Sequence, residues 1–115
     1  MRNNIRTCIT IPQYANVTVY GDIYHLTVTF NVKPSIISYI KPKSNIWDVE
    51  LFHKNKRNYI TAKLDIPIKK IVESGICVTD CIFYYSSRMC NDLKTILREA
   101  KIKELQEEVK QLSLF

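Results

Sequence analysis

His25-Leu26-Thr27-Val28-Thr29-Phe30-Asn31-Val32 is the stretch that decides the fold. Apolar and polar side chains alternate along it, so an extended chain puts the apolar set on one side and the polar set on the other. The pattern ends at Lys33-Pro34, because proline cannot donate a hydrogen bond to a neighbouring strand. We therefore expect a strand with one side buried, placed in a sheet with other parts of the chain.

Two strands are predicted before this stretch, and a long loop is predicted after it. Residues 5–11 alternate and predict a strand, and residues 17–20 predict a second short one, followed by a turn at Gly21-Asp22. Residues 34–57 are polar and basic, and they form a long loop with a short strand inside it at residues 47–52. Long loops in compact domains are often functional.

The middle of the chain predicts helices and short strands. Residues 58–64 are expected to be helical, and Pro67 suits the first turn of a next helix. Gly75 stands where that helix should stop. Residues 76–78 and 81–85 are rich in β-prone side chains and predict buried or edge strands.

A long final helix completes the expected architecture. Asn91 and Asp92 open it and it runs to about Lys110, with an apolar stripe made of Leu93, Ile96, Leu97, Ala100, Leu105 and Val109. These patterns predict an α+β fold with a small mixed sheet, a helical middle segment and a long C-terminal helix. The length of 115 residues predicts one domain over residues 1–110, followed by a tail at residues 111–115.

Composition favours a protein of the cytoplasm. The chain is 46% hydrophobic, which is ordinary for a globular protein, and no apolar run approaches the roughly 20 residues that a bilayer needs. The basic start of the chain has no apolar segment behind it, so no signal peptide is expected. The four cysteines, Cys8, Cys77, Cys81 and Cys90, lack a zinc-site spacing and are expected to be reduced, mostly buried thiols. The alternative is a metal held by Cys77, Cys81 and Cys90 together with His25 or His53.

The net charge of +6 favours an anionic partner, and nucleic acid is the usual one. A solvated lysine-rich face is the alternative. We expect five basic residues to contact DNA: Lys41, Lys43, Lys56, Arg57 and Lys63. We expect four tyrosines to stack on unpaired bases, Tyr14, Tyr20, Tyr24 and Tyr39, and three others to be partly buried, Tyr59, Tyr84 and Tyr85.

The last five residues, Gln111-Leu112-Ser113-Leu114-Phe115, resemble the consensus peptide by which bacterial polymerases, mismatch-repair proteins and loader subunits bind the DNA polymerase sliding clamp. The resemblance implies that the peptide docks in extended form, with Gln111 hydrogen-bonded in a polar notch and Leu112 and Ser113 in the contact. Leu114 and Phe115 would fill an apolar pocket as the anchoring residues. The alternative is that these apolar side chains fold back onto the core.

A second resemblance covers the body of the chain in patches. Residues 9–12, 58–65 and 75–80 resemble the opening strand and central segment of the RusA-like Holliday-junction resolvases. In that family an Asp-x-Asp-Asn motif opens a helix that carries a lysine, and an Asp-Asp pair follows. The acidic pair departs here, because its two aspartates fall on Asn55 and Arg57 and the helix lysine falls on Thr61.

A second register of the same resemblance restores the acidic residues. Asp48-Val49-Glu50 followed by Lys54 imitates the motif, and Asp80 matches the later pair. The resemblance then implies a catalytic group of Asp48, Glu50, Lys54 and Asp80, in which the three carboxylates hold Mg²⁺ for phosphodiester hydrolysis. The alternatives are a solvated strand face for Asp48 and Glu50 and a turn position for Asp80.

Two functions are therefore expected from different classes. One is a divergent RusA-like, magnesium-dependent endonuclease that acts on branched DNA and is brought there by the sliding clamp. Such resolvases act as dimers, and the apolar stripe on residues 93–109 or an edge strand would supply the dimer face. The other is a non-catalytic protein of a phage or bacterium that binds the clamp and modulates or inhibits replication.

Overall fold

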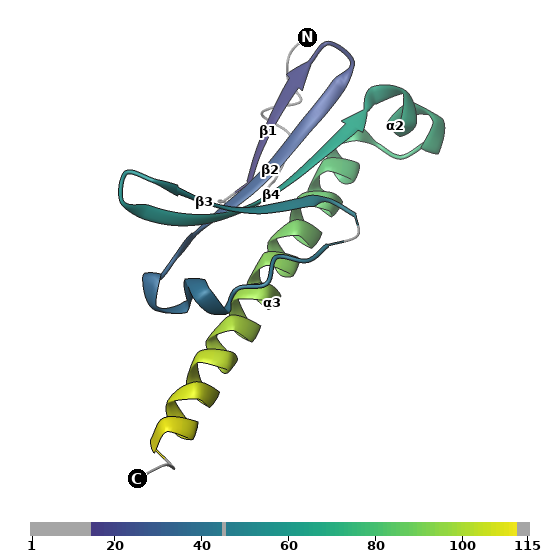
Figure 1. The fold of residues 1–115 in the computed structure, drawn as a ribbon. Coiled ribbons are helices and arrows are strands. Elements are labelled where there is room, and N and C mark those ends of the chain that lie inside the picture. The colour runs from purple at the N-terminus through teal and green to yellow at the C-terminus, as the bar shows by residue number, and fades with distance from the viewer. Residues whose placement is uncertain (1–14, 45, 113–115) are drawn as a thin grey trace.

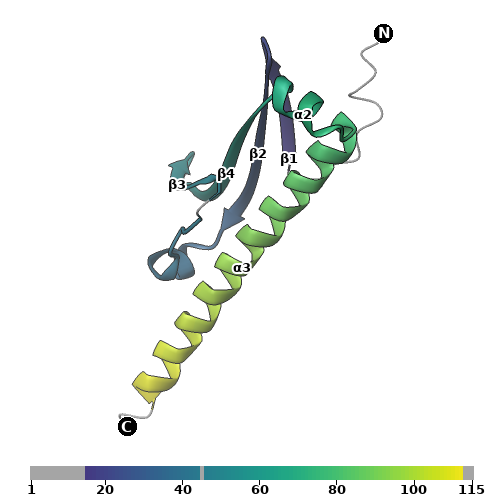
Figure 2. The same cartoon turned by 90° about the vertical axis from the view of Figure 1, so that its right-hand side faces the viewer.

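The computed structural model describes residues 15–44 and 46–112, with side chains as far as Lys110. The chain forms two layers, a four-stranded antiparallel sheet and a long helix that crosses one face of it (Figures 1 and 2). No helix formed by the described residues covers the other face, which is called the open face below. The predicted α+β class is confirmed, although the sheet is antiparallel throughout and not mixed.

The sheet has the strand order β1-β2-β4-β3. The strands predicted at residues 17–20, 25–32 and 47–52 are all present with small shifts at their ends. Their bounds, with those of the fourth strand, are Ala15–Tyr20 for β1, Ile23–Val32 for β2, Asp48–Lys54 for β3 and Arg57–Pro67 for β4. A short 3₁₀ helix, η1 at Pro34–Tyr39, begins where proline was expected to end β2.

Tight turns set the register of the sheet. Gly21 joins β1 to β2 with a φ of 58°, and the two residues between β3 and β4, Asn55 and Lys56, have φ values of 53° and 62°. Positive φ at both central residues is the conformation of a two-residue type I′ turn, whose twist suits an antiparallel hairpin. The turn makes Lys54 the partner of Arg57 and thereby fixes the face to which every β3 and β4 side chain points.

The helices follow the sheet in the chain. The α2 helix, Ile68–Ser74, starts directly after Pro67 and ends at Gly75, whose φ of 74° is the left-handed conformation that favours glycine. The predicted stop at Gly75 is confirmed, whereas Pro67, expected in the first turn, is the N-cap residue that precedes it. The α3 helix, Val78–Leu112, has 35 residues and runs the length of the molecule, whose longest dimension is 66 Å.

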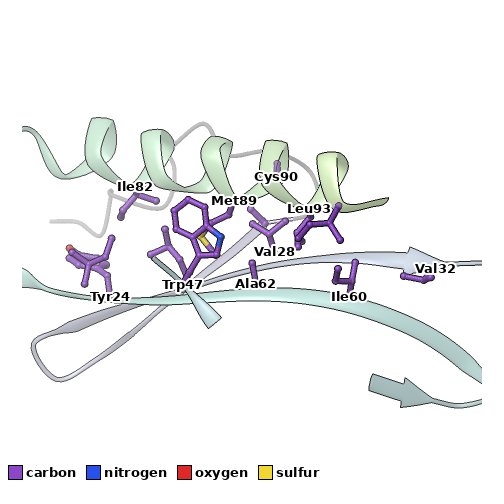
Figure 3. Packing of buried hydrophobic residues seen from close by; sticks show 14 of the residues in the cluster. Tyr24, Val28, Val32, Trp47, Ile60, Ala62, Ile82, Met89, Cys90 and Leu93 are labelled. Atoms are coloured by element: carbon purple, nitrogen blue, oxygen red, sulfur yellow. The ribbon is translucent and has the colours of Figure 1, made fainter. Parts of the chain in front are cut away.

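The core lies between α3 and the sheet (Figure 3). The helix contributes Ile82, Met89 and Leu93, which have no exposed surface, at spacings of seven and four residues along one side of the helix. Side chains on alternate positions of β2 and β4 meet them: Leu26, Val28, Ile60 and Ala62. Burying each large aliphatic side chain stabilises the fold by about 1.5–3 kcal/mol.

The predicted helix at residues 58–64 is wrong. These residues belong to β4, which pairs with β2 on one side and with β3 on the other. A central strand is buried on parts of both faces, so Thr61, at 3% exposure, is buried between Ile60 and Ala62 and hides the alternation on which a strand prediction depends.

The predicted strands at residues 76–78 and 81–85 are also wrong. The α3 helix begins at Val78, thirteen residues before the start expected at Asn91. Ile82 and Met89 continue the helical spacing of Leu93 towards the N-terminus, and burial of this stripe outweighs the β-propensity of Phe83, Tyr84 and Tyr85.

The strand predicted at residues 5–11 lies outside the described residues. Among the described residues, none of the helices is long and apolar enough to cross a membrane.

Candidate functional site

The structure does not assemble the predicted magnesium site. Asp48 and Glu50 are exposed on the open face, because the residues that alternate with them in β3, Val49 and Leu51, pack towards the core. Asp80 lies in the first turn of α3, which covers the opposite face of the sheet. Within the described part of the chain, no three His, Cys, Asp or Glu residues are grouped so that they could hold a metal ion.

The remaining features of the nuclease prediction are separated in the same way. Lys54 lies on the open face at the far end of β3 from Asp48, and Glu50 is paired with Lys63, with 3.6 Å between the carboxylate oxygen Oε2 and the ammonium Nζ. Thr61, the position of the family's helix lysine, lies in a strand and its hydroxyl is 3.1 Å from that of Thr29. The central helix that the RusA resemblance implies is absent from residues 57–67.

The open face carries a different group of side chains at its hairpin end. Phe52 of β3 and Tyr59 of β4 are paired in register, with ring centroids 6.1 Å apart and ring planes inclined by 36°. The next pair on this face is Lys54 and Arg57. We call these four side chains the ring-and-cation patch.

Two depressions adjoin the ring-and-cation patch. One, of about 310 Å³, is lined by Thr29, Phe52, Lys54, Asn55 and Tyr59. The other, of about 460 Å³, lies at the end of β2 and brings Lys33 together with Lys56 and Arg57. The hairpin end of the sheet therefore concentrates positive charge beside two aromatic rings.

The five basic residues predicted to contact DNA are divided between two surfaces. Lys56 and Arg57 lie at the hairpin end and Lys63 lies further along the open face. Lys41 and Lys43 follow η1 and line cavities against α3, with Lys103 beside the first and Trp47 and Arg88 beside the second. No single surface holds all five.

Trp47 fixes the loop that contains Lys43. Its indole is buried, and Nε1 donates a hydrogen bond of 2.9 Å to Oδ2 of Asp92 in α3. The contact connects the start of β3 to the helix layer.

The clamp peptide, residues 111–115, begins at the end of α3. Gln111 and Leu112 continue the helix backbone, and Ser113, Leu114 and Phe115 lie outside the described residues. Between Lys101 and Lys110, every side chain except that of Glu104 is exposed. This part of α3 extends beyond the sheet as an arm (Figure 1).

The predicted dimer stripe on residues 93–109 is split by this geometry. Leu93, Ile96 and Ala100 are buried against the protein's own sheet, so they are not available to a second copy. Leu105 and Val109 belong to the arm and are exposed, together with Ile102.

Glu104 marks the last point at which α3 touches the body. Its carboxylate accepts a hydrogen bond of 2.9 Å from Nζ of Lys101. This bond is the main cause that lowers the pKa of Glu104, and a hydrogen bond from Ser35 in η1 and the charge of Lys33 lower it further. The charged form of Glu104 thus connects the helix to η1.

The three cysteines that the structure describes are not grouped as metal ligands. Cys77 is exposed just before α3, and hydrogen bonds from the Thr79 hydroxyl and from the backbone N–H groups of Thr79 and Asp80 lower the pKa of its thiol. Cys81 and Cys90 are buried in the core, and this burial raises the pKa of both thiols. The two histidines are bonded elsewhere on the sheet, His25 to Asp65 and His53 to Asn58.

The sequence patterns did not identify Phe52, Lys54 and Tyr59 as one group. Tyr59 was expected to be partly buried, which is confirmed, but its ring edge still borders the open depression. The Asn55-Lys56 turn is the signal that could have revealed the group, because a two-residue hairpin pairs residues 52 and 59.

Comparison of the chain with protein-family models, with curated protein sequences and with solved structures finds no match.

Proposed function

We propose that this chain is a non-catalytic binding protein that docks on the bacterial sliding clamp through residues 111–115 and so acts where DNA is replicated. The sequence of the clamp peptide combines a glutamine for a polar notch with two adjacent large apolar residues for a pocket. Such short peptides bind in extended form, so docking would unwind Gln111 and Leu112 from the end of α3. A few apolar anchors carry most of the binding free energy.

The observation that carries the proposal is the exposed arm of α3 that leads into the clamp peptide. Residues 101–112 add about 18 Å of helix beyond the last core position, Ala100. The arm separates Leu112, where the described helix ends, from the sheet and its core, so a clamp could approach this end of the helix without displacing packed side chains. This separation is a reason to prefer docking over the alternative in which Leu114 and Phe115 complete the core.

The binding function is preferred to the nuclease function because of the carboxylates. Phosphodiester hydrolysis by two or three carboxylates requires them to share a cation. Asp48 and Glu50 are on the open face, whereas Asp80 belongs to the helix layer. A carboxylate group divided by a sheet gives no shared site for Mg²⁺.

A titration of purified bacterial sliding clamp with the full chain tests the proposal. We expect saturable binding in the micromolar range or tighter, typical of short peptide docking. The double substitution Leu114→Ala and Phe115→Ala should weaken it by about 100-fold or more, because both anchors are lost. Calorimetry or biolayer interferometry measures the affinity.

The matched control is Ile102→Ala with Val109→Ala, which removes two exposed apolar side chains from the arm and leaves residues 111–115 intact. This variant should bind the clamp as the parent chain does. Equal clamp affinity of the parent and the Leu114/Phe115 variant, or no binding by the parent chain, would contradict the proposal. Thermal unfolding of each variant shows whether the body is still folded.

A further inference from the structure

We propose that the open face of the sheet binds single-stranded DNA at the ring-and-cation patch, with bases stacked on Phe52 and Tyr59 and phosphates held by Lys54 and Arg57. This inference goes beyond clamp docking and depends on a different part of the molecule. Sheet faces that carry exposed rings beside positive charge are suited to unpaired nucleotides, because every base offers a face for stacking.

The placement of the four side chains supports both kinds of contact at once. Phe52 is 41% exposed on a face that no described helix covers, so part of its ring is accessible to a ligand. The Lys54–Arg57 pair lies two residues closer to the turn than the Phe52–Tyr59 pair. Two residues of a strand span about 7 Å. A nucleotide stacked on the rings would therefore carry its phosphate towards the cations.

The charges at the hairpin end are uncompensated. Among the described residues, Lys54, Lys56 and Arg57 form no ion pair with a carboxylate. At the other end of the same face, Lys63 is paired with Glu50, and His25 with Asp65. The face is thus polarised, and its positive end coincides with the two rings, so a polyanion has one preferred place to bind.

The sheet holds this patch in a fixed geometry. The rings lie on two strands that are paired in register, and β4 is itself paired with β2 from Asn58 to Pro67. The bond between the Thr29 and Thr61 hydroxyls, at 3.1 Å, lies one pair away from the rings on the same face. A rigid platform loses little entropy on binding, which favours affinity.

Single strands are preferred to duplex DNA because the faces of paired bases are hidden in the stack. A ring can reach a base face only where the base is unpaired or flipped out, and flipping costs a few kcal/mol. A duplex could use the cations alone. Discrimination between single strand and duplex should therefore depend on Phe52 and Tyr59.

Fluorescence anisotropy with a labelled oligo(dT) of about 15 nucleotides tests the inference, using the full chain at about 50 mM salt, where phosphate contacts are strong. Phe52→Leu with Tyr59→Leu keeps apolar bulk on the sheet and removes both rings. We expect it to weaken binding by about tenfold or more, as loss of base stacking does. Phe52→Trp should retain binding, because it restores a ring.

The charge contribution is measured separately with Lys54→Gln and Arg57→Gln. This variant should bind more weakly, and its plot of log affinity against log salt should be shallower by about 1.4, or about 0.7 for each cation removed. The matched control is Lys69→Gln with Lys70→Gln in α2, which removes the same charge at a distance from the patch. The control should keep the parent salt slope.

Several outcomes would overturn the inference. Binding that is unchanged in the Leu variant, or equal for single strand and duplex of one sequence, would mean that the rings are not used. Tighter binding of oligo(U) RNA than of oligo(dT) would assign the patch to RNA. A chain lacking residues 111–115 should bind oligo(dT) unchanged, so failure of clamp docking and failure of this inference are distinguishable.

Discussion

The two faces of the sheet have different compositions and different expected roles. The face under α3 is aliphatic and closed, with Leu26, Val28 and Ile60 fully buried against the helix. The open face has threonines at its centre, ion pairs at one end and the ring-and-cation patch at the other. Stability therefore depends on one set of alternate residues and the proposed DNA contact on the other, although both sets occupy the same strands.

The largest expected effect comes from Ile60→Ala on the covered face. Ile60 has no exposed surface, so truncation leaves a cavity and should lower the free energy of unfolding by about 2–5 kcal/mol. Lys63→Ala, on the same strand but on the open face, removes only an exposed ion pair and should change it by less than about 1 kcal/mol. Urea unfolding measures both. Similar losses of unfolding free energy for the two variants would mean that the two faces contribute equally to stability.

A smaller loss of stability is expected from Trp47→Phe. Phenylalanine keeps a ring in the core but removes the hydrogen bond from Nε1 to the Asp92 carboxylate, which should lower the free energy of unfolding by about 1.5–3 kcal/mol, as for bonds to charged groups. Asp92→Asn keeps an acceptor for the indole and should lose less. An unchanged midpoint of urea unfolding for Trp47→Phe would show that the indole bond does not stabilise the covered face.

Glu104→Gln should have a modest effect that depends on pH. The pKa of Glu104 is lowered in the folded protein, so its contribution is complete above the unfolded value of about 4.3 and is lost as pH falls through the folded pKa. The variant should therefore melt below the parent chain at pH 7, and the difference should shrink as the pH falls below the unfolded pKa. Thermal melts across this range test the sign, and a difference that grows on acidification would contradict it.

The smallest effect on stability is expected at Cys77, where the readout is chemical. Because its pKa is lowered, Cys77 should react with a maleimide at pH 7 several-fold faster than an ordinary exposed thiol, whereas Cys81 and Cys90 should stay protected until the chain unfolds. Thr79→Ala removes the main cause and should slow the reaction at pH 7. The experiment uses a Cys8→Ser background, since Cys8 lies outside the described residues. Rapid labelling of Cys90 in the folded chain would mean that α3 does not cover its face stably.

The sequence predicted the elements that have a single pattern and missed those in which two patterns compete. The β2 strand has a clean alternation, and α2 has a proline before it and a glycine after it, so both were predicted close to their observed bounds. The β4 strand is central and has Thr61 buried among apolar neighbours, which removes the alternation. The first three turns of α3 contain aromatic and β-branched residues, which become helical because one side of the helix packs against the sheet.

The candidate sites differ in how far sequence could define them. The clamp peptide is five consecutive residues, so its chemistry is visible in the sequence whatever the fold. The ring-and-cation patch combines Phe52 and Lys54 with Arg57 and Tyr59 across a hairpin, and its composition appears only when the turn and the register are known. The carboxylates of the predicted magnesium site resemble a motif in the sequence, but the fold does not group them, because Asp48 and Glu50 lie on the sheet and Asp80 on the helix layer.

The length of α3 has a consequence for direction as well as for distance. A helix rotates by about 100° per residue, so the number of residues in the arm sets both its length and the side of the helix on which Leu112, its last residue, lies. Deleting one arm residue would turn that side by about 100° and shorten the arm by only about 1.5 Å. Deleting seven would shorten it by about 10 Å and turn that side by only about 20°. Spacing and orientation relative to the open face can therefore be varied independently in one helix.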